Sequence, residues 1–387
     1  MLPSMLPELT PDQAAQSAAV MRALRAAIAA HSGWLAFDDY LRLVLYAPGL
    51  GYYSAGSAKL GAAGDFVTAP ELSDLFARCL ASQCAPLLRM GGGDVLELGA
   101  GTGRLALGLM RRLAELGDVP AHYYILEVSA DLRQRQQALL QQLPRELRSR
   151  LEWLDAPPAT PITGVILANE VADALPFRRF VIDSGRFYER GVGLSAAGAL
   201  VDADCPAAPD LIAELTRIAP GAWPQHYLSE LCPMLAPWVA SMAAPLARGL
   251  LLLIDYGLPR PEYYHPQRDR GTLRCHFRHR AHDQPLLYPG VQDVTAWVDF
   301  TRVAEAAVDA GLTVGGYCTQ AAFLLASGIE AEVAAAVDTI ERARLASQAR
   351  SLLLPGEMGE NFKVMALTRG LDLPLRGFAL QDLRRTL

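Results

Sequence analysis

The chain has no closely paired cysteines. None of its six cysteines is separated from another by only two residues. This spacing favours neither a zinc ribbon nor a disulfide scaffold, so we expect reduced thiols in a reducing compartment. One segment, RCHFRHRAHD at residues 274–283, contains cysteine, histidine and aspartate together. Its spacing matches no standard zinc pattern, so we predict no metal site and interpret the segment as a solvated loop.

An excess of positive charge is also absent. The formal net charge is -6. Proteins that bind phosphate backbones usually carry a basic excess, so the composition argues against a nucleic acid partner.

The chain has no uninterrupted apolar run long enough to span a membrane. Its most apolar window, residues 234–254, contains Pro237, Pro245 and Arg248 and is followed at once by Asp255. A membrane helix needs about 20 predominantly apolar residues. The first residues also lack the apolar centre of a signal peptide. We therefore expect a cytoplasmic protein without membrane insertion.

Short apolar runs alternate with helical patterns from about residue 94 onward. Strands are predicted within DVLELGAG, AHYYILEVS, RLEWLDAP, TGVILAN, GLLLLIDYG, AAVDAGLTVGGYCT and GENFKVMALTRG. A helix is predicted before the fifth strand, from about Tyr227 to Ala247. Strand–helix alternation is typical of a parallel sheet with helices on both faces. The sequence therefore predicts an α/β fold with a Rossmann-like, seven-stranded sheet.

Other segments do not follow this alternation. Val20, Leu24 and Ile28 recur at helical spacing and predict a helix within an N-terminal helical segment. Further along, the pattern after Phe177 predicts a β-hairpin that turns at Ser184-Gly185. We expect two insertions to form a cap on the core. The predicted boundaries are 1–63 for the N-terminal segment, 64–370 for the core, about 177–225 and 258–299 for the insertions, and 371–387 for a C-terminal tail.

A glycine-rich turn follows the first predicted strand. In VLELGAGTGRL, glycines stand at positions 99, 101 and 103 and precede a helical pattern. Such a turn lets a small ligand approach the backbone and the helix N-terminus closely. A nicotinamide fingerprint needs glycine where Arg104 stands, and a P-loop needs a GK[ST] motif that the chain lacks. The GxGxG spacing after Glu97 resembles the cofactor loop of class I S-adenosylmethionine-dependent methyltransferases.

This resemblance implies a set of cofactor contacts. Glu97 would hold the ammonium end of S-adenosylmethionine, and Glu127 would accept both ribose hydroxyls, for which a carboxylate is suited. Leu154 and Asp155 would bracket the adenine. Thr68 would either contact the cofactor or serve as the N-cap of the next helix. The full predicted cofactor set is Thr68, Glu97, Gly99, Ala100, Gly101, Thr102, Gly103, Glu127, Val128, Leu154, Asp155 and Asn169.

Longer motifs resemble one family, the MidA-type methyltransferases, which include bacterial relatives of a mitochondrial assembly methyltransferase for respiratory complex I. The motifs are PGLGYYS (48–54), GDFVTAPELS (64–73), LELGAGTG (96–103), ANEVADALP (168–176), LLIDYG (252–257), GTLR (271–274), QDVTAWVDF (292–300) and GEMGENFKVMAL (356–367). Two positions depart from the family pattern. Val128 stands where proline is frequent, and Trp297 where histidine is usual.

The resemblance implies that Asn169, Glu170 and Asp173 lie beside the transferred methyl group. Because the mitochondrial relative methylates a protein arginine, these acids would hold a guanidinium, which carboxylates bind through bidentate contacts. Glu170 is predicted to be the main residue that holds the guanidinium. Asp173 would complete this contact, accept the proton or cap the following turn. Asp255 and Tyr256 would line the acceptor channel or only end their strand.

The predicted function is therefore protein arginine methylation, with a respiratory NADH dehydrogenase subunit as the expected kind of partner. Two alternatives remain open at this point. One is an assembly chaperone that binds S-adenosylmethionine with little turnover, and the other is a small-molecule methyltransferase. The oligomeric state is left open, a homodimer included.

Overall fold

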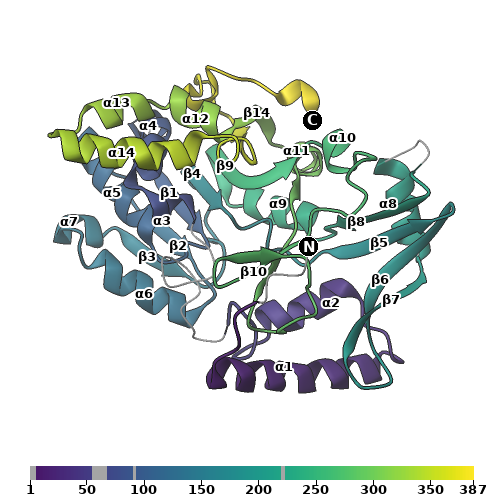
Figure 1. The fold of residues 1–387 in the computed structure, drawn as a ribbon. Coiled ribbons are helices and arrows are strands. Elements are labelled where there is room, and N and C mark those ends of the chain that lie inside the picture. The colour runs from purple at the N-terminus through teal and green to yellow at the C-terminus, as the bar shows by residue number, and fades with distance from the viewer. Residues whose placement is uncertain (1–5, 55–67, 90–92, 219–222) are drawn as a thin grey trace. The chain divides into compact units, whose positions relative to one another are not determined.

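The chain folds into two compact units, each assembled from three separate stretches. Figure 1 shows the computed structural model, which describes residues 6–54, 68–89, 93–218 and 223–387. The first unit contains Met1–Phe66, Asp173–Leu235 and Arg260–Trp297, and the second contains Val67–Ala172, Ala236–Pro259 and Val298–Leu387. The N-terminal segment and most of the two predicted insertions therefore fall in one unit.

The second unit contains the predicted sheet. Its main strands are β1 (Asp94–Leu98), β2 (Tyr123–Leu126), β3 (Leu151–Leu154), β4 (Ile162–Asn169), β9 (Leu246–Leu258), β14 (Thr313–Thr319) and β15 (Phe362–Arg369). They pair in the order β14-β15-β9-β4-β1-β2-β3, and β13 (Val298–Asp299) pairs with β9 beside this path. Strands β1 to β4 and β9 are parallel, whereas β15 runs antiparallel to both of its neighbours. The seven strands predicted from the sequence are confirmed.

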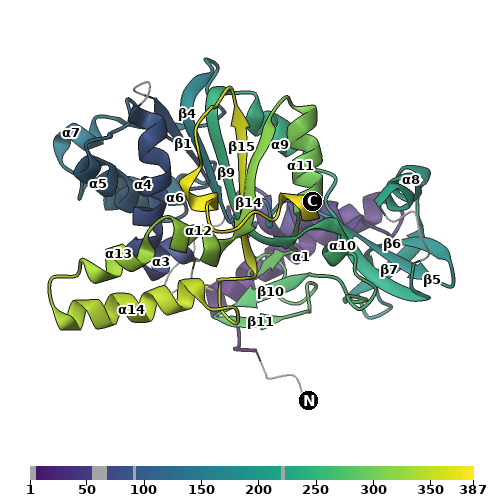
Figure 2. The ribbon, with the colours of Figure 1, turned by 90° about the horizontal axis from the view of Figure 1, so that it is seen from above.

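Helices cover both faces of this sheet. In Figure 2, α4 (Asp74–Arg89) and α5 (Arg104–Leu116) lie on one side of β4, β9 and β15, and α9 (Leu235–Ala243) and α11 (Phe300–Asp309) lie on the other. The apolar stripe of α5 is buried, including Leu105, Leu109 and Leu113, because such a helix must bury that stripe against the sheet. The remaining helices of this unit are α3 (Ala69–Leu72), α6 (Ala130–Leu140), α7 (Arg145–Arg148), α12 (Gln320–Ala326), α13 (Ile329–Ala334), α14 (Thr339–Leu353), η2 (Arg376–Phe378) and η3 (Arg384–Thr386).

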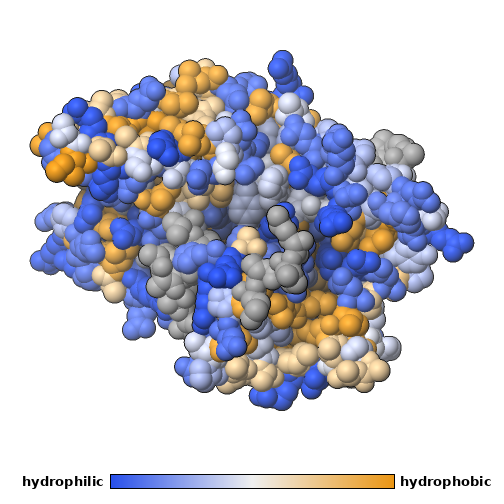
Figure 3. Space-filling model, viewed as in Figure 1, coloured by the Kyte–Doolittle hydropathy of each residue, from blue (hydrophilic) through white to orange (hydrophobic). Residues whose placement is uncertain are grey.

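Apolar side chains also reach the surface of the second unit. Figure 3 shows them over α13 and α14. Ile340 on α14 is 82% exposed, and Val337, in the link between the two helices, is 98% exposed. Within the described ranges, no helix combines the length and the apolar character needed to cross a membrane.

The first unit begins with the predicted N-terminal helix. This helix, α1 (Pro11–Ala30), opens with a capping box between Thr10 and Gln13 and buries Val20, Leu24 and Ile28. Both ends of the capping box satisfy a backbone N–H that would otherwise lack a partner. The unit's other helical elements are α2 (Phe37–Leu41), η1 (Arg42–Tyr46), α8 (Pro209–Ile218) and α10 (Arg260–Tyr263).

Two small antiparallel sheets complete the first unit. One has the order β7-β6-β5-β8, and the other β11-β10-β12. The strands are β5 (Arg178–Asp183), β6 (Arg186–Leu194), β7 (Leu200–Pro206), β8 (His226–Leu231), β10 (Arg274–Phe277), β11 (Arg280–His282) and β12 (Asp293–Thr295). The predicted hairpin is confirmed as β5 and β6.

Two predictions for local structure are wrong. The helix predicted from about Tyr227 begins only at Leu235, because residues 226–231 pair with β5 as strand β8. The segment predicted as a solvated loop, residues 274–283, forms β10 and β11 instead. Cys275 is fully buried there, and burial raises the pKa of its thiol.

Candidate functional site

A loop with three glycines joins β1 to α5. Gly99, Gly101 and Gly103 have φ angles of 59°, 55° and 88°, a conformation that glycine adopts without steric cost. A Cβ atom at Gly99 would lie 3.3 Å from Cγ2 of Val171. Because glycine has no side chain, the backbone of this loop is uncovered at these three positions. A small ligand can therefore approach the peptide groups that precede α5.

The short helix α3 contacts this loop. The carboxylate of Glu71 accepts a hydrogen bond from the hydroxyl of Thr102 and lies 3.6 Å from Nε of Arg104. Thr68 is the N-cap residue of α3, but in the described part of the chain its hydroxyl makes no capping hydrogen bond. Its predicted cofactor contact stays a prediction. Residues 64–67 of the same motif lie outside the described residues.

Glu97 lies almost at the end of β1 and is buried, with 3% of its surface exposed. The hydroxyl of Tyr123 on β2 donates to Glu97 Oε2 at 2.6 Å. Burial raises the pKa of Glu97 to about 7, while the Tyr123 hydrogen bond lowers it and the nearby charge of Glu127 raises it. A carboxylate with this pKa favours a cationic ligand, because a positive charge stabilises its ionised form.

Glu127 follows β2 and is held by two neighbours. Its carboxylate accepts the Ser129 N–H at 2.8 Å and the Gln136 side-chain amide at 3.0 Å. Burial raises the pKa of Glu127, and these hydrogen bonds partly oppose that effect. The carboxylate is therefore fixed in orientation at the carboxyl end of β2.

Gln136 was missed by the sequence analysis. It is fully buried on α6, where its amide nitrogen donates to Glu127 and to the Gly101 carbonyl oxygen at 2.9 Å, and its amide oxygen accepts from Trp153 Nε1 at 3.0 Å. One side chain thus connects β2, β3 and the glycine loop. The sequence contains one signal that could have identified Gln136. It stands at helical spacing between Leu132 and Leu140, so it falls on the apolar stripe of α6 although it is polar.

The predicted adenine-binding residues, Leu154 and Asp155, lie at the end of β3. Arg133 on α6 donates to the Leu154 carbonyl oxygen at 3.0 Å and to the Asp155 carboxylate at 2.6 Å. Asp155 is 89% exposed on its side chain, and the apolar Val128 is 84% exposed. These positions leave an apolar side chain uncovered next to Glu127, but contact with adenine stays a prediction.

Asn169 and Glu170 lie at the carboxyl end of β4. The Asn169 side-chain amide donates to Glu170 Oε1 at 3.1 Å. The other side-chain atom, Asn169 Oδ1, is buried and has no hydrogen-bond partner among the described residues. Glu170 has a φ angle of 53°, in the left-handed region that is uncommon for a residue other than glycine. Strained conformations of this kind cluster at functional sites.

The turn after Glu170 is positioned by Asp255 at the end of β9. Asp255 is fully buried, and its two carboxylate oxygens accept the backbone N–H groups of Ala172 and Tyr256, each at 2.9 Å. Of the two predicted roles, these contacts support the structural one, in which Asp255 orders the backbone around residues 169–172.

Asp173, the other predicted acid, belongs to the first unit. It is 7% exposed, and its backbone carbonyl oxygen accepts the Ala296 N–H at 3.3 Å. The structure therefore brings Glu97, Glu127, Asn169 and Glu170 to one edge of the second unit's sheet, and the predicted role of Asp173 beside them stays a prediction.

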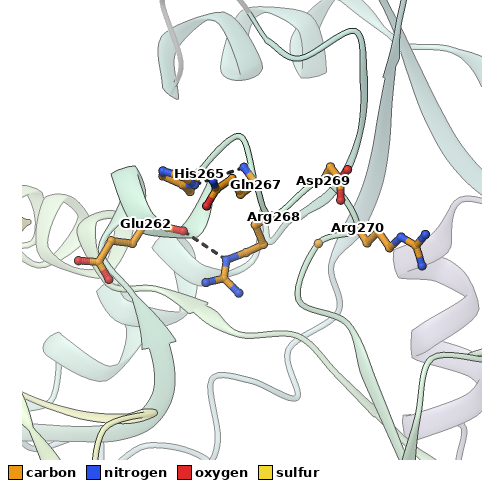
Figure 4. Close-up of a pocket in the computed structure, with 7 residues that line it drawn as sticks. Glu262, His265, Gln267, Arg268, Asp269 and Arg270 are labelled. Atoms are coloured by element: carbon orange, nitrogen blue, oxygen red, sulfur yellow. Dashed lines mark hydrogen bonds between the residues drawn. The ribbon is translucent and has the colours of Figure 1, made fainter.

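A polar pocket of about 530 Å³ lies in the first unit. Figure 4 shows its lining by Glu262, His265, Gln267, Arg268, Asp269, Arg270 and Gly271. The guanidinium of Arg268 lies 5.2 Å from the centre of the Trp297 ring. This cation–π contact gives Trp297 a role that a histidine would fill less well.

Among the described residues, no group of histidine, cysteine, aspartate and glutamate side chains could hold a metal ion.

Comparison with known proteins extends over nearly the whole chain. A family model described as "Putative S-adenosyl-L-methionine-dependent methyltransferase" matches residues 79–318. The chain is 28% identical over 375 residues to the mitochondrial protein arginine methyltransferase NDUFAF7 of Danio rerio, covering 87% of this chain and 84% of that protein. It is 27% identical over 379 residues to NDUFAF7 of Homo sapiens, covering 87% and 80%.

Among solved structures, a COG1565 superfamily member from Burkholderia thailandensis, bound to S-adenosyl-homocysteine, is 45% identical to this chain. The TM-score is 0.94, and the match covers 99% of this chain and 100% of that one.

Proposed function

Because the chain belongs to this family of S-adenosylmethionine-dependent methyltransferases, we propose that it methylates an arginine side chain of a protein. Its cofactor is S-adenosylmethionine, and its sheet is that of the class I methyltransferases. The arginine acceptor is supported by the acid at the end of β4 and by the name shared by the mitochondrial relatives.

The residues at the edge of the sheet fit this cofactor. Glu97, buried and with a raised pKa, would pair with the cofactor's ammonium group. Glu127, fixed by Gln136, would accept the two ribose hydroxyls. The exposed Val128 would be covered by the adenine ring. The glycine loop would let the rest of the molecule lie against the backbone.

The chemistry proposed needs positioning more than acid–base assistance. S-adenosylmethionine supplies an activated methyl group on a positively charged sulfur. The protein must orient one guanidinium nitrogen towards that methyl group, and orientation of this kind lowers barriers by about 7–11 kcal/mol. We propose that Glu170 orients the guanidinium. Its carboxylate accepts a hydrogen bond from Asn169, and its backbone is strained at the end of β4, where the methyl group is predicted to be transferred.

Proton removal follows the new N–CH3 bond. When the nitrogen attacks, the C–S bond breaks and the sulfur loses its positive charge; the methylated group keeps one positive charge, so the attacking nitrogen gives up one proton, which a carboxylate or water can take. We assign acceptance of this proton to Glu170, whose carboxylate lies at the end of β4. Asp173 remains a predicted second acid.

We also propose that the partner is a subunit of a respiratory NADH dehydrogenase and that the enzyme works in the cytoplasm. Both statements extend the resemblance of the sequence motifs and depend on identification of the methylated protein.

Transfer of labelled methyl groups tests the proposed function. Extract of a deletion strain is incubated with labelled S-adenosylmethionine and either the wild-type protein, Glu170→Gln or the control Glu146→Gln, whose residue is exposed on α7. We expect a discrete labelled protein that yields methylarginine on hydrolysis. The label should fall about 100-fold or more with Glu170→Gln, since loss of one partner of a buried charge pair costs several kcal/mol, and should be unchanged with Glu146→Gln.

Two results would contradict the proposal. Label that appears only in small molecules would favour a different acceptor class. Absence of any label, with binding of S-adenosyl-homocysteine intact by calorimetry, would favour a protein that binds the cofactor without turnover.

A further inference from the structure

Two tyrosines and two aspartates from distant parts of the chain meet in the first unit. Tyr46 and Tyr53 come from the N-terminal segment, Asp173 follows β4 in sequence, and Asp293 opens β12. We call these four residues the Tyr–Asp cluster. Three sequence motifs contribute to it, namely PGLGYYS, ANEVADALP and QDVTAWVDF.

Hydrogen bonds fix both phenol rings of the cluster. The Tyr53 hydroxyl donates to Asp293 Oδ1 at 2.7 Å, and the Tyr46 hydroxyl donates to the Ala174 carbonyl oxygen at 2.7 Å. The centres of the two rings are 5.4 Å apart. Two half-buried tyrosine side chains are thus held in place, and Tyr53 contacts the carboxylate of Asp293, a residue that is 2% exposed.

Asp173 lies close to the same rings. Its backbone is tied to β12 by the Ala296 N–H. Burial raises the pKa of Tyr46, and the negative charges of Asp293 and Asp173 raise it further. The same two carboxylates act on Tyr53, whose pKa is also raised first by burial. Both aspartates therefore lie within electrostatic reach of both phenols.

Thr295 supplies an independent indication of a ligand. It is 1% exposed, and its Oγ1 atom is buried without a hydrogen-bond partner in the described part of the chain. Side chains alternate between the two faces of a strand, so Thr295 points to the same face of β12 as Asp293. Buried hydroxyl groups nearly always find a partner. Because none of the described residues pairs with this hydroxyl, it can accept a hydrogen bond from a ligand on this face.

We propose that the Tyr–Asp cluster and Thr295 bind the guanidinium group of an arginine side chain in the protein acceptor. The inference rests on the proposed function and extends it, because it assigns acceptor recognition to residues of the first unit. A guanidinium offers five N–H donors in one plane and two flat faces. The carboxylates and the threonine hydroxyl match the donors, and the tyrosine rings match the faces.

This arrangement discriminates against related side chains. A lysine ammonium has the same charge but no flat face for the rings to cover. A citrulline side chain has a similar shape to arginine but no charge for the aspartates to attract. The cluster is therefore expected to prefer arginine to both.

Binding of a small probe tests the inference without methyl transfer. The probe is N-acetyl-L-arginine methylamide, and the comparison is the corresponding citrulline compound. The full chain is saturated with S-adenosyl-homocysteine, and binding is measured by saturation-transfer NMR. We expect the arginine probe to bind and the citrulline compound to bind at least tenfold more weakly.

Three variants and one control locate the site. Asp293→Asn should weaken binding of the arginine probe at least tenfold. Thr295→Val, which keeps the shape of the residue, should weaken it about threefold, as expected for one hydrogen bond. Tyr53→Phe removes the donor that orients the Asp293 carboxylate and should also weaken it about threefold. Asp12→Asn removes an exposed acid of the same unit and should change nothing. Affinity for S-adenosyl-homocysteine should stay constant in all four, which also shows that they are folded.

The inference is overturned if the arginine and citrulline probes bind equally, or if the folded Thr295→Val and Tyr53→Phe variants bind the arginine probe as the wild type does. These results differ from a failure of the proposed function. That failure would appear as absence of methylarginine in the labelling experiment, whether or not the probe binds.

Discussion

The side-chain amide of Gln136 donates to the Glu127 carboxylate at 3.0 Å and thereby fixes the acid predicted to bind ribose. Replacement of Gln136 by leucine keeps the size and helix preference of the residue but removes this donor. We expect Gln136→Leu to bind S-adenosyl-homocysteine about tenfold more weakly, because a buried acceptor that loses its donor costs about 1–3 kcal/mol. Titration calorimetry measures the change.

Gln137→Leu is the matched control for this variant. Gln137 follows on the same helix but is exposed, so the control should bind like the wild type. Equal affinity of Gln136→Leu and Gln137→Leu would show that Glu127 needs no support from α6.

Cofactor affinity should depend on pH through Glu97. Burial raises the pKa of Glu97 to about 7, so in the free protein the group is mostly neutral at pH 6 and mostly ionised at pH 8. An ammonium ligand pairs only with the ionised form. We therefore expect affinity for S-adenosyl-homocysteine to rise about tenfold from pH 6 to pH 8.

Proton release provides a second measure of this dependence. At pH 6, calorimetry in buffers of different ionisation enthalpy should report a proton released on binding. Glu97→Gln should remove both the proton release and the rise in affinity. A rise that persists unchanged in Glu97→Gln would assign it to another group.

The strained backbone of Glu170 predicts a difference between two variants. A residue with a Cβ atom in the left-handed region costs about 1–2 kcal/mol relative to glycine, whereas glycine loses more entropy on folding. Both Glu170→Gly and Glu170→Ala lose the carboxylate and its contacts. We expect Glu170→Gly to be the more stable of the two, by up to about 1 kcal/mol in the free energy of unfolding, and both to lose methyl transfer. Denaturant titration measures the free energy of unfolding. If Glu170→Gly is less stable than Glu170→Ala, the backbone at residue 170 is not strained.

Asp255 is expected to be intolerant of its closest substitute. Each of its oxygens accepts a backbone N–H, whereas asparagine would place an NH2 group against one of those donors. We expect Asp255→Asn to reduce the free energy of unfolding by about 1–3 kcal/mol or more and to slow methyl transfer through the displaced turn at residues 169–172. Asp309→Asn, at an exposed position of α11, is the control for thermal unfolding.

Local patterns in the sequence predicted the larger sheet well. Its strands are continuous apolar runs such as Val165–Ala168. The glycines of the loop stand at positions where the backbone has positive φ angles, so their spacing could be interpreted from the sequence alone. Strand β8 was mistaken for helix because Ser229 and Glu230 are buried along with its apolar residues. Burial of these polar groups depends on distant partners, among them the Thr272 N–H that donates to Glu230 at 2.7 Å.

The candidate site was predictable only in part for a similar reason. Glu97, Glu127 and Glu170 end strands whose order could be inferred, so their common edge followed. Gln136 and Thr295 carry no motif of their own. Gln136 matters because its helix places it against two strands and a loop, and Thr295 because a strand pairing buries its hydroxyl. Neither relationship is local in the sequence.

The interleaved division of the chain has a consequence for synthesis. The first unit lacks its last stretch until Trp297 has been translated. The second unit lacks the central strand β9 until Leu258 has been translated, and the neighbouring strand β15 until Arg369 has been translated. Domains made of one continuous stretch can fold in turn as they leave the ribosome. Here both units must wait for late residues, so we expect nascent chains to stay incomplete, and to need protection from aggregation, until most of the protein has been made.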